Sequence, residues 1–134
     1  MAKNKNNKAF WGTRIKKTSS LFQKIGNSID VDKRLFNEDI KGSEAHVKML
    51  SKQKIISKRI EKKILRGLKK IQNEISKKKF KFDRKYEDIH MNIENRLGQL
   101  IGDDAGYIHT GRSRNDQVIT DFKLWIKSSS QDLD

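Results

Sequence analysis

The sequence contains no cysteine and no proline. Without cysteine the chain can form no disulfide, no thiolate metal site and no thiol nucleophile, which agrees with a cytoplasmic location. Without proline, long uninterrupted helices are possible. No stretch approaches the roughly 18–20 consecutive apolar residues that cross a bilayer, and no apolar segment follows the basic N-terminus as it would in a secretory signal. We therefore expect a cytoplasmic protein without membrane association.

Acidic residues are few, and the 134-residue chain carries a net charge of +14. The basic excess lies in residues 1–86, whereas residues 87–134 hold more acidic than basic side chains. The basic residues are mostly lysines, and they lack the interleaved aromatic side chains of a nucleic-acid-binding groove. We interpret them as a general polybasic surface, and we expect no nucleic acid partner. A small basic helical module that binds nucleic acid or an acidic partner remains the alternative hypothesis.

Apolar residues recur with helical spacing and nowhere alternate with a period of two over a useful length, so the predicted fold class is all-α. A first helix is expected to begin at a cap formed by Asp30 or Asp32. Gly42 lies inside this helix, where glycine costs roughly 1 kcal/mol against alanine, so we expect close packing there. The apolar positions of this helix are Val31, Leu35, Phe36, Ile40, Ala45, Val47 and Leu50.

A second helix is predicted to begin after Ser57, which is a good N-cap residue. Its apolar face consists of Ile60, Ile64, Leu68, Ile71 and Ile75. A third helix, which Gly102 is placed to end, carries Tyr86, Ile89, Ile93, Leu97 and Ile101.

A fourth helix follows the Arg-Ser-Arg sequence at residues 112–114. Its apolar stripe comprises Val118, Phe122, and Trp125 or Ile126. Nothing later in the sequence can cover this stripe. We therefore expect a missing partner segment, and we interpret the chain as an N-terminal fragment of a longer protein.

Residues 106–117 combine a turn bracketed by two glycines with two arginines, a serine and an Asn-Asp-Gln sequence. An arginine offers a planar fork of donors that matches a carboxylate in two-point contact. The start of a helix adds unpaired N–H groups and the positive end of a dipole. The motif therefore predicts a site for a small ligand rich in carboxylates. The alternative is a structural Arg/Asp network that ties the loop to the helix.

Blocks of residues along most of the chain carry a resemblance to a known family. They are Trp11–Arg14, Ser28–Leu35, Glu38–Ser43, Ala45–His46, Met49–Leu50, Gly67–Leu68, Glu87–Glu94, Arg96–Leu97, His109–Gln117, Thr120–Asp121 and Leu124–Trp125. Over roughly residues 9 to 127 the chain resembles the N-terminal part of argininosuccinate lyases, members of the fumarase/aspartase superfamily. Thr13 and Ile15 depart from the usual family sequence of glycine and phenylalanine, which affects only the packing of the N-terminal arm.

The resemblance implies an organisation and a reaction. Residues 1–20 would form a polar N-terminal arm, residues 21–111 the N-terminal helical domain, and residues 112–134 the start of the first long helix of the central bundle. The reaction is the reversible cleavage of argininosuccinate into arginine and fumarate in arginine biosynthesis. It needs no metal and no organic cofactor, and the family works as a homotetramer. Donors aimed at the developing charge and a general acid for the leaving nitrogen would supply the rate.

The resemblance also implies roles for residues of this chain. Arg114 and Asn115 would hold carboxylate oxygens of the substrate, with Ser113 beside them, and Ser28 would donate its hydroxyl. From the sequence alone, Ser28 is also a good helix cap. We interpret Arg112 and Asp116 as an internal salt bridge that shapes the loop.

Several further polar residues are weaker candidates for the site. Asp88 and His90 are two residues apart, and on a helix they would point about 200° apart, so they can share a pocket only if the helix begins there. Lys52 could contact the substrate, although a solvated lysine is the simpler interpretation. We expect His109 to satisfy backbone groups in the turn and His46 to be an ordinary helix-face residue.

The proton-transfer residues of the family lie downstream of the resembling blocks. They are a Thr-His pair on the acid side and a Gly-Ser-Ser loop whose serine is the favoured general base. None of these motifs occurs in the 134 residues. We therefore assign no catalytic acid or base and expect no lyase activity from the chain alone.

Overall fold

Every regular element in residues 25–131, the part of the chain that the computed structural model describes, is a helix. The elements are α2 (Ile29–Asp32), η2 (Lys33–Leu35), α3 (Phe36–Lys52), α4 (Lys58–Ser76), α5 (Ile89–Ile101), η3 (Gly102–His109) and α6 (Arg114–Gln131). The all-α prediction is confirmed for these residues. The predicted arm, residues 1–20, lies outside them. No helix within the described range is long and apolar enough to cross a membrane.

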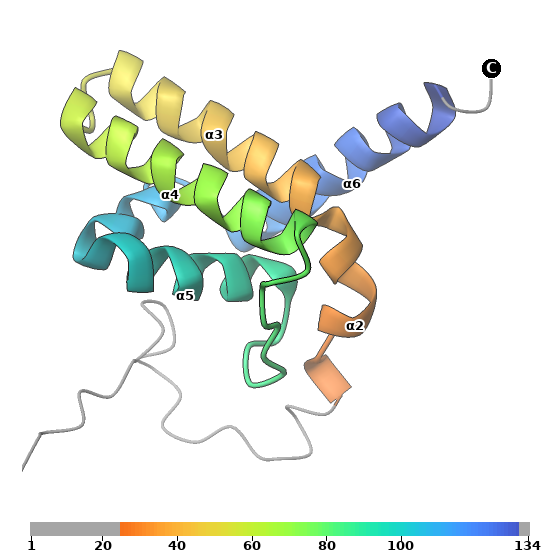
Figure 1. Cartoon of the computed structure of the whole chain (residues 1–134). Coiled ribbons are helices and arrows are strands. Elements are labelled where there is room, and N and C mark those ends of the chain that lie inside the picture. The colour runs from red at the N-terminus through yellow and green to blue at the C-terminus, as the bar shows by residue number, and fades with distance from the viewer. Residues whose placement is uncertain (1–24, 132–134) are drawn as a thin grey trace, which may run out of the picture.

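Helices α3 and α4 lie side by side as a hairpin (Figure 1). The connection turns at Lys54, whose φ is 60°. Ser57 then caps α4 as predicted, because its hydroxyl oxygen accepts a hydrogen bond from the Ile60 N–H at 3.3 Å. This cap satisfies one of the backbone donors that the first turn of a helix leaves unpaired.

The expected first helix is divided into α2, the 3-10 turn η2 and α3, so that prediction was wrong in its detail. Neither Asp30 nor Asp32 caps a helix with its side chain, and the N-cap position of α2 belongs to Ser28. The tighter turn of η2 changes which residues face inward. Consequently Val31, expected in the core, is 63% exposed, whereas Ile29 is buried.

Helix α5 begins at Ile89 because Asp88 caps it, accepting a hydrogen bond from the Met91 N–H at 2.7 Å. Tyr86, expected on the helix, lies before it. Gly102 ends the helix as predicted, with a φ of 70° that side chains other than glycine rarely adopt.

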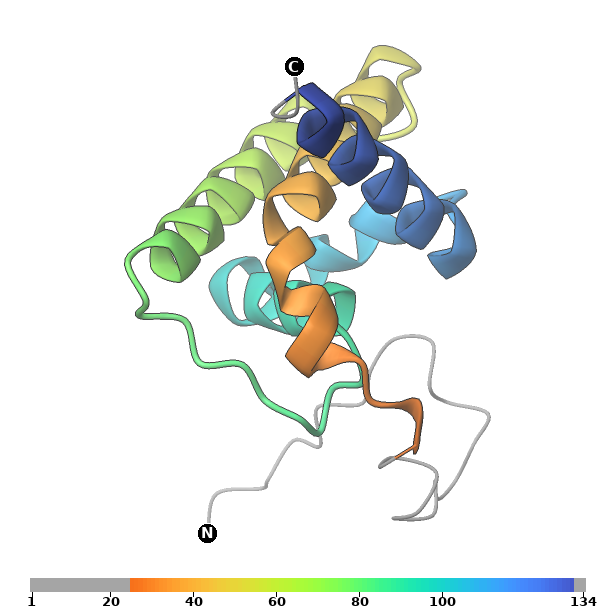
Figure 2. The same ribbon diagram turned by 90° about the vertical axis from the view of Figure 1, so that its right-hand side faces the viewer.

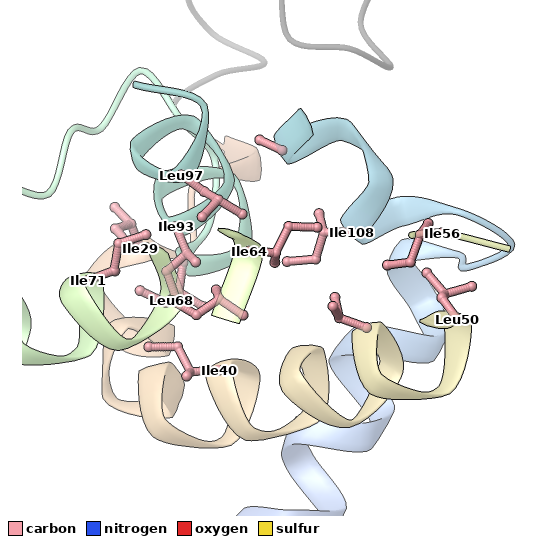
Figure 3. Packing of buried hydrophobic residues seen from close by; sticks show 13 residues of the cluster. Ile29, Ile40, Leu50, Ile56, Ile64, Leu68, Ile71, Ile93, Leu97 and Ile108 are labelled. Atoms are coloured by element: carbon pink, nitrogen blue, oxygen red, sulfur yellow. The ribbon is translucent and has the colours of Figure 1, made fainter. Parts of the chain in front are cut away.

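One apolar core joins α3, α4, α5 and η3 (Figure 3). It consists of Ile29, Ile40, Val47, Leu50, Ile56, Ile64, Leu68, Ile71, Ile89, Ile93, Leu97, Ala105 and Ile108. Ala45, which the sequence placed with the apolar face of α3, is exposed. Gly67 marks the closest approach of α4 to α5, because a Cβ atom added there would collide with Leu97.

Helix α6 crosses α3 (Figure 2) and its C-terminal half extends beyond the other helices (Figure 1). A Cβ atom on Gly42 would lie 3.5 Å from the Thr120 side chain, an ordinary van der Waals distance, so the close packing expected at this glycine is not confirmed. The side chains that α6 buries are polar, Gln117 and Asp121. Its apolar stripe faces outward: Val118, Phe122, Trp125 and Ile126 are 41%, 50%, 38% and 45% exposed.

Candidate functional site

A cluster of buried polar side chains joins α3, α5 and α6. We call it the polar cluster; its members are Asp39, His90, Gln117 and Asp121, each no more than 3% exposed. His90 Nδ1 lies 3.0 Å from Asp39 Oδ1 and 3.4 Å from Asp121 Oδ2. The Gln117 amide donates to the same Asp39 oxygen. These contacts connect three helices through groups that would be costly to bury alone.

Arg112 lies at the edge of the polar cluster and donates a 3.0 Å hydrogen bond to the Ser43 hydroxyl. Burial lowers the pKa of Arg112, while the charges of Asp39 and Asp121 oppose that effect. A guanidinium stays charged at any physiological pH. Arg112 therefore balances part of the negative charge buried between α3 and α6.

The pKa values of the two carboxyl groups in the polar cluster are shifted in opposite directions. Burial raises the pKa of Asp121 to about 8, the charge of Asp39 adds to the effect, and His90 and Arg112 oppose it. Burial also acts to raise the pKa of Asp39, but the hydrogen bonds and charges around it, chiefly those of His90, outweigh burial and lower the pKa. Two carboxyl groups in one low-dielectric site cannot both ionise easily. Asp39 is thus the ionised partner and Asp121 the protonated one near neutral pH.

His90 faces the ionised carboxylate of Asp39. Burial acts to lower the pKa of His90, but the hydrogen bond and charge of Asp39, with the nearby Asp88 and Asp121, raise it above the ordinary value. The imidazole therefore tends to carry a proton, which agrees with an Asp39–His90 ion pair.

Asp39, His90 and Asp121 also offer three possible metal ligands whose atoms lie within 4.8 Å of one another. A cation there would require a free Nδ1 on His90 and would compete with the Gln117 amide for Asp39. The positive charge of Arg112 lies nearby as well. The donors already present therefore favour a hydrogen-bonded network over a metal centre.

Ser28 and Asp32 meet the start of α5. The Ser28 hydroxyl donates to Asp32 Oδ2 at 2.6 Å, and Asp32 Oδ1 accepts from the Ile89 N–H at 3.2 Å. The Ser28 backbone N–H donates to the Glu87 carbonyl at 2.8 Å. Burial raises the pKa of Asp32, the Ser28 hydrogen bond opposes this rise and the charge of Asp88 adds to it. The α2 segment is thereby fixed beside the N-terminus of α5.

Arg114 faces the same end of α5. Its Nε lies 3.7 Å from Asp88 Oδ2, and one terminal nitrogen lies 3.5 Å from Glu94 Oε2. The other terminal nitrogen donates a 2.9 Å hydrogen bond to Gln117 Oε1. Ser28, held through Asp32 at the Ile89 N–H, and Arg114, in contact with Asp88, therefore both lie at the N-terminal end of α5. Helix α5 begins between Asp88 and His90, but Asp88 contacts Arg114 whereas His90 is buried in the polar cluster.

The remaining predicted residues of the loop lie at the first turn of α6. The Ser113 hydroxyl accepts from the Asn115 N–H at 3.2 Å, and Asp116 Oδ2 accepts from the Ser113 N–H at 3.1 Å. Asn115 is exposed. The expected Arg112–Asp116 salt bridge does not form within residues 25–131, because Arg112 turns to Ser43 and Asp116 closes the helix start.

The structure corrects the prediction for His109, agrees with that for His46 and places Lys52 away from the site. His109 Nε2 contacts Glu94 Oε2 at 2.8 Å instead of backbone groups. His46, on the face of α3, also contacts the Thr110 carbonyl at 2.9 Å. Lys52 is exposed at the end of α3, roughly 15 Å along the helix axis from Gly42 at 1.5 Å per residue. Lys52 is not brought to the site.

Comparison with known proteins assigns the chain to a family. A model of the family described as "Lyase" matches residues 12–133. The chain belongs to the lyase family. Three similar relatives are all named argininosuccinate lyase. The one from Pelagibacter ubique is 66% identical over 99% of this chain, that from Ehrlichia canis 55% over 89%, and that from Bartonella bacilliformis 46% over 99%.

The chain spans less than a third of the length of these lyases, namely 29%, 26% and 29% of them in the same order. The family and the residue pattern agree with the resemblance drawn from the sequence. They do not favour the alternative of a basic module that binds nucleic acid.

Several residues of this lyase segment were given no role from the sequence, although Gln117 lies within the motif that predicted the site. Asp39, Gln117 and Asp121 form the polar cluster, and Glu94 joins Arg114 to His109. One available signal was the four-residue spacing of Gln117 and Asp121, which places both on one helix face. The apolar stripe on the opposite face obscured that signal.

A separate cavity of about 530 Å³ opens beside the connection from α4 to α5. Its lining residues are Glu74, Lys79, Phe80, Lys81, Asp83, Lys85, Tyr86, Asn92, Asn95, Arg96 and Gln99. None of the predicted site residues of the lyase segment lines it, so the candidate site is the region around Arg114 and Ser28.

Proposed function

We propose that this chain forms the N-terminal part of an argininosuccinate lyase, which cleaves argininosuccinate reversibly into arginine and fumarate. The names of the three relatives and the match to the lyase family support this proposal. The structural observation that carries it is that Ser28, through Asp32, is held at the Ile89 N–H, while Arg114 contacts the neighbouring Asp88. It brings a hydroxyl and a guanidinium from distant parts of the sequence to the same end of α5.

In this proposal Arg114 and Asn115 bind carboxylate oxygens of the substrate. The contacts of Arg114 with Asp88 and Glu94, at 3.7 and 3.5 Å, are longer than hydrogen bonds. Its Nε and its buried Nη2 make no hydrogen bond within the described residues, so both keep a donor for a carboxylate in two-point contact. Asn115 is exposed at the helix start and has an amide N–H₂ to offer. Ser28, with Ser113 beside Arg114, supplies hydroxyl groups.

The proposal places the general acid and base outside residues 1–134, as the family resemblance implies. It assigns residues 112–134 to the start of the first long helix of a central bundle in a cytoplasmic homotetramer. The outward apolar stripe of α6 supports that assignment, because such a surface is stable when another helix covers it. By the same resemblance the reaction uses no metal or organic cofactor.

A chimera tests the proposal. Residues 1–134 replace the matching 29% of the Pelagibacter ubique relative, and fumarate formation from argininosuccinate is followed by its ultraviolet absorbance. We expect activity from the chimera and none from the chain alone. Arg114→Ala in the chimera should reduce kcat/KM by roughly a hundredfold or more, because a charged hydrogen bond to the substrate is lost. A folded chimera without activity, or an Arg114→Ala chimera with parental activity, would contradict the proposal.

The matched control is Arg59→Ala, an exposed arginine on α4 whose contact with Asp104 is at the 4.0 Å limit of a salt bridge. It removes the same charge far from Arg114 in the sequence and should leave kcat/KM unchanged.

A further inference from the structure

Gln117 connects Arg114 with the polar cluster. Its amide oxygen accepts the 2.9 Å hydrogen bond from Arg114, and its amide nitrogen donates to Asp39. Gln117 is 3% exposed, so water cannot replace either partner. The two ends of one side chain therefore join a partly exposed guanidinium to a buried carboxylate.

Arg114 needs such a partner if its orientation is to be fixed. An arginine side chain has many rotamers, and a two-point contact with a carboxylate requires one orientation of its planar fork. Asp88 and Glu94 attract its charge from 3.7 and 3.5 Å, but at those distances they do not define a hydrogen-bond direction. Of Asp88, Glu94 and Gln117, only Gln117 makes a hydrogen bond of normal length to the Arg114 guanidinium.

Gln117 is in turn hydrogen-bonded to a buried neighbour, Asp39. Asp39 lies on α3, is 1% exposed, and its Oδ1 also contacts His90 Nδ1 at 3.0 Å. The orientation of the Gln117 amide is consequently set, because only its nitrogen end can donate to Asp39 and its oxygen end must then face Arg114. A glutamate at this position would keep the acceptor but would bring a second carboxylate against Asp39.

We propose that Gln117 is a positioning residue of the substrate site, which fixes the guanidinium of Arg114 for a carboxylate by anchoring it to Asp39. This inference rests on the proposed function, because it assumes that Arg114 binds the substrate. It assigns the polar cluster a role: Asp39 and His90 hold the Gln117 amide in the orientation that Arg114 requires.

The test is a double-mutant cycle in the chimera described above. Gln117→Met has a similar length and removes both hydrogen bonds, and Arg114→Lys keeps the charge but removes the fork. We expect Gln117→Met to raise KM about tenfold in the parent, the size expected for one hydrogen bond to a charged group. In the Arg114→Lys chimera the same change should raise KM less than about twofold, because the oriented fork is already absent.

Two further variants separate positioning from general damage. Gln131→Met, an exposed glutamine on the same helix, should leave KM unchanged. If Gln117→Met does not fold, as judged by circular dichroism and melting temperature, Gln117→Glu takes its place. That variant should raise KM, and adding Asp39→Asn, which supplies an amide donor to the new carboxylate, should bring KM back toward the parental value.

The outcomes distinguish the two proposals. A folded parental chimera without lyase activity overturns the proposed function and this inference with it. An active parent in which Gln117→Met raises KM equally in both backgrounds overturns the inference alone. The same holds if Asp39→Asn leaves the KM of the Gln117→Glu chimera unchanged.

Discussion

Asp121→Asn should change how the stability of this chain depends on pH. Asp121 is fully buried between α6 and α3, and neither of its carboxylate oxygens accepts a hydrogen bond within residues 25–131. Burial is the main reason why its pKa is raised to about 8, from 3.8 in an unfolded chain. Between these two values the folded protein retains a proton that the unfolded chain has released.

The sign and size of the effect follow from this difference. Where the folded state binds one more proton, the free energy of unfolding falls as pH rises, by at most about 1.4 kcal/mol per pH unit. The loss begins near pH 4 and is complete above about pH 8. Asparagine carries no such proton. Relative to the parent, the variant should therefore gain about 2–3 kcal/mol of stability between pH 6 and pH 8.

Urea denaturation followed by circular dichroism at several pH values from 5 to 9 measures this difference. Asp103→Asn, which removes an exposed carboxylate, controls for the change in net charge and should remain parallel to the parent. The raised pKa of His90 also makes the free energy of unfolding fall as pH rises above 6.5. Because Asp39 is the main cause of that raised pKa, this fall is expected in the parent and in the Asp121→Asn variant. If the Asp121→Asn and parental curves stay parallel from pH 5 to 8, the argument from burial is refuted.

Two further predictions concern the helices that carry the site, each measured by urea denaturation. Ser57→Ala should lower the free energy of unfolding by about 1 kcal/mol, because the Ile60 N–H loses its acceptor; no loss would show that the cap is not formed in solution. Gly67→Val should cost about 1–3 kcal/mol through its collision with Leu97, and Leu97→Ala in the same chain should recover part of that cost. Gly98→Ala, with open space around its Cβ position, is the matched control; equal losses in both would contradict the packing argument.

The sequence predicted the helices best where local signals and packing agree. In α4 the apolar spacing, the Ser57 cap and the buried residues Ile64, Leu68 and Ile71 all coincide. The division of the first helix was not predictable locally. Asp32 looks like a cap in the sequence, but its side chain is used by Ser28 and by the Ile89 N–H, which lies 57 residues away.

The sequence motif indicated the residues of the candidate site, whose role stays a prediction, but it did not indicate the polar cluster. The sequence indicated Ser28, Arg114 and Asn115, and the structure brings the first two to one end of α5. Asp39 and Gln117 are 78 residues apart, and nothing local to either shows that the two will form a hydrogen bond. The contact between Asp39 and Gln117 depends on how α6 packs across α3, which the local sequence does not specify.

The polar underside of α6 also fixes the helix mechanically. Aliphatic side chains alone make no directional contacts that fix the register of a helix, but a shift of about 5.4 Å here would separate the buried Gln117 amide from Asp39 and Arg114. Gln117 thereby sets the register of α6 on α3, and with it the direction in which the outward apolar stripe of α6 faces.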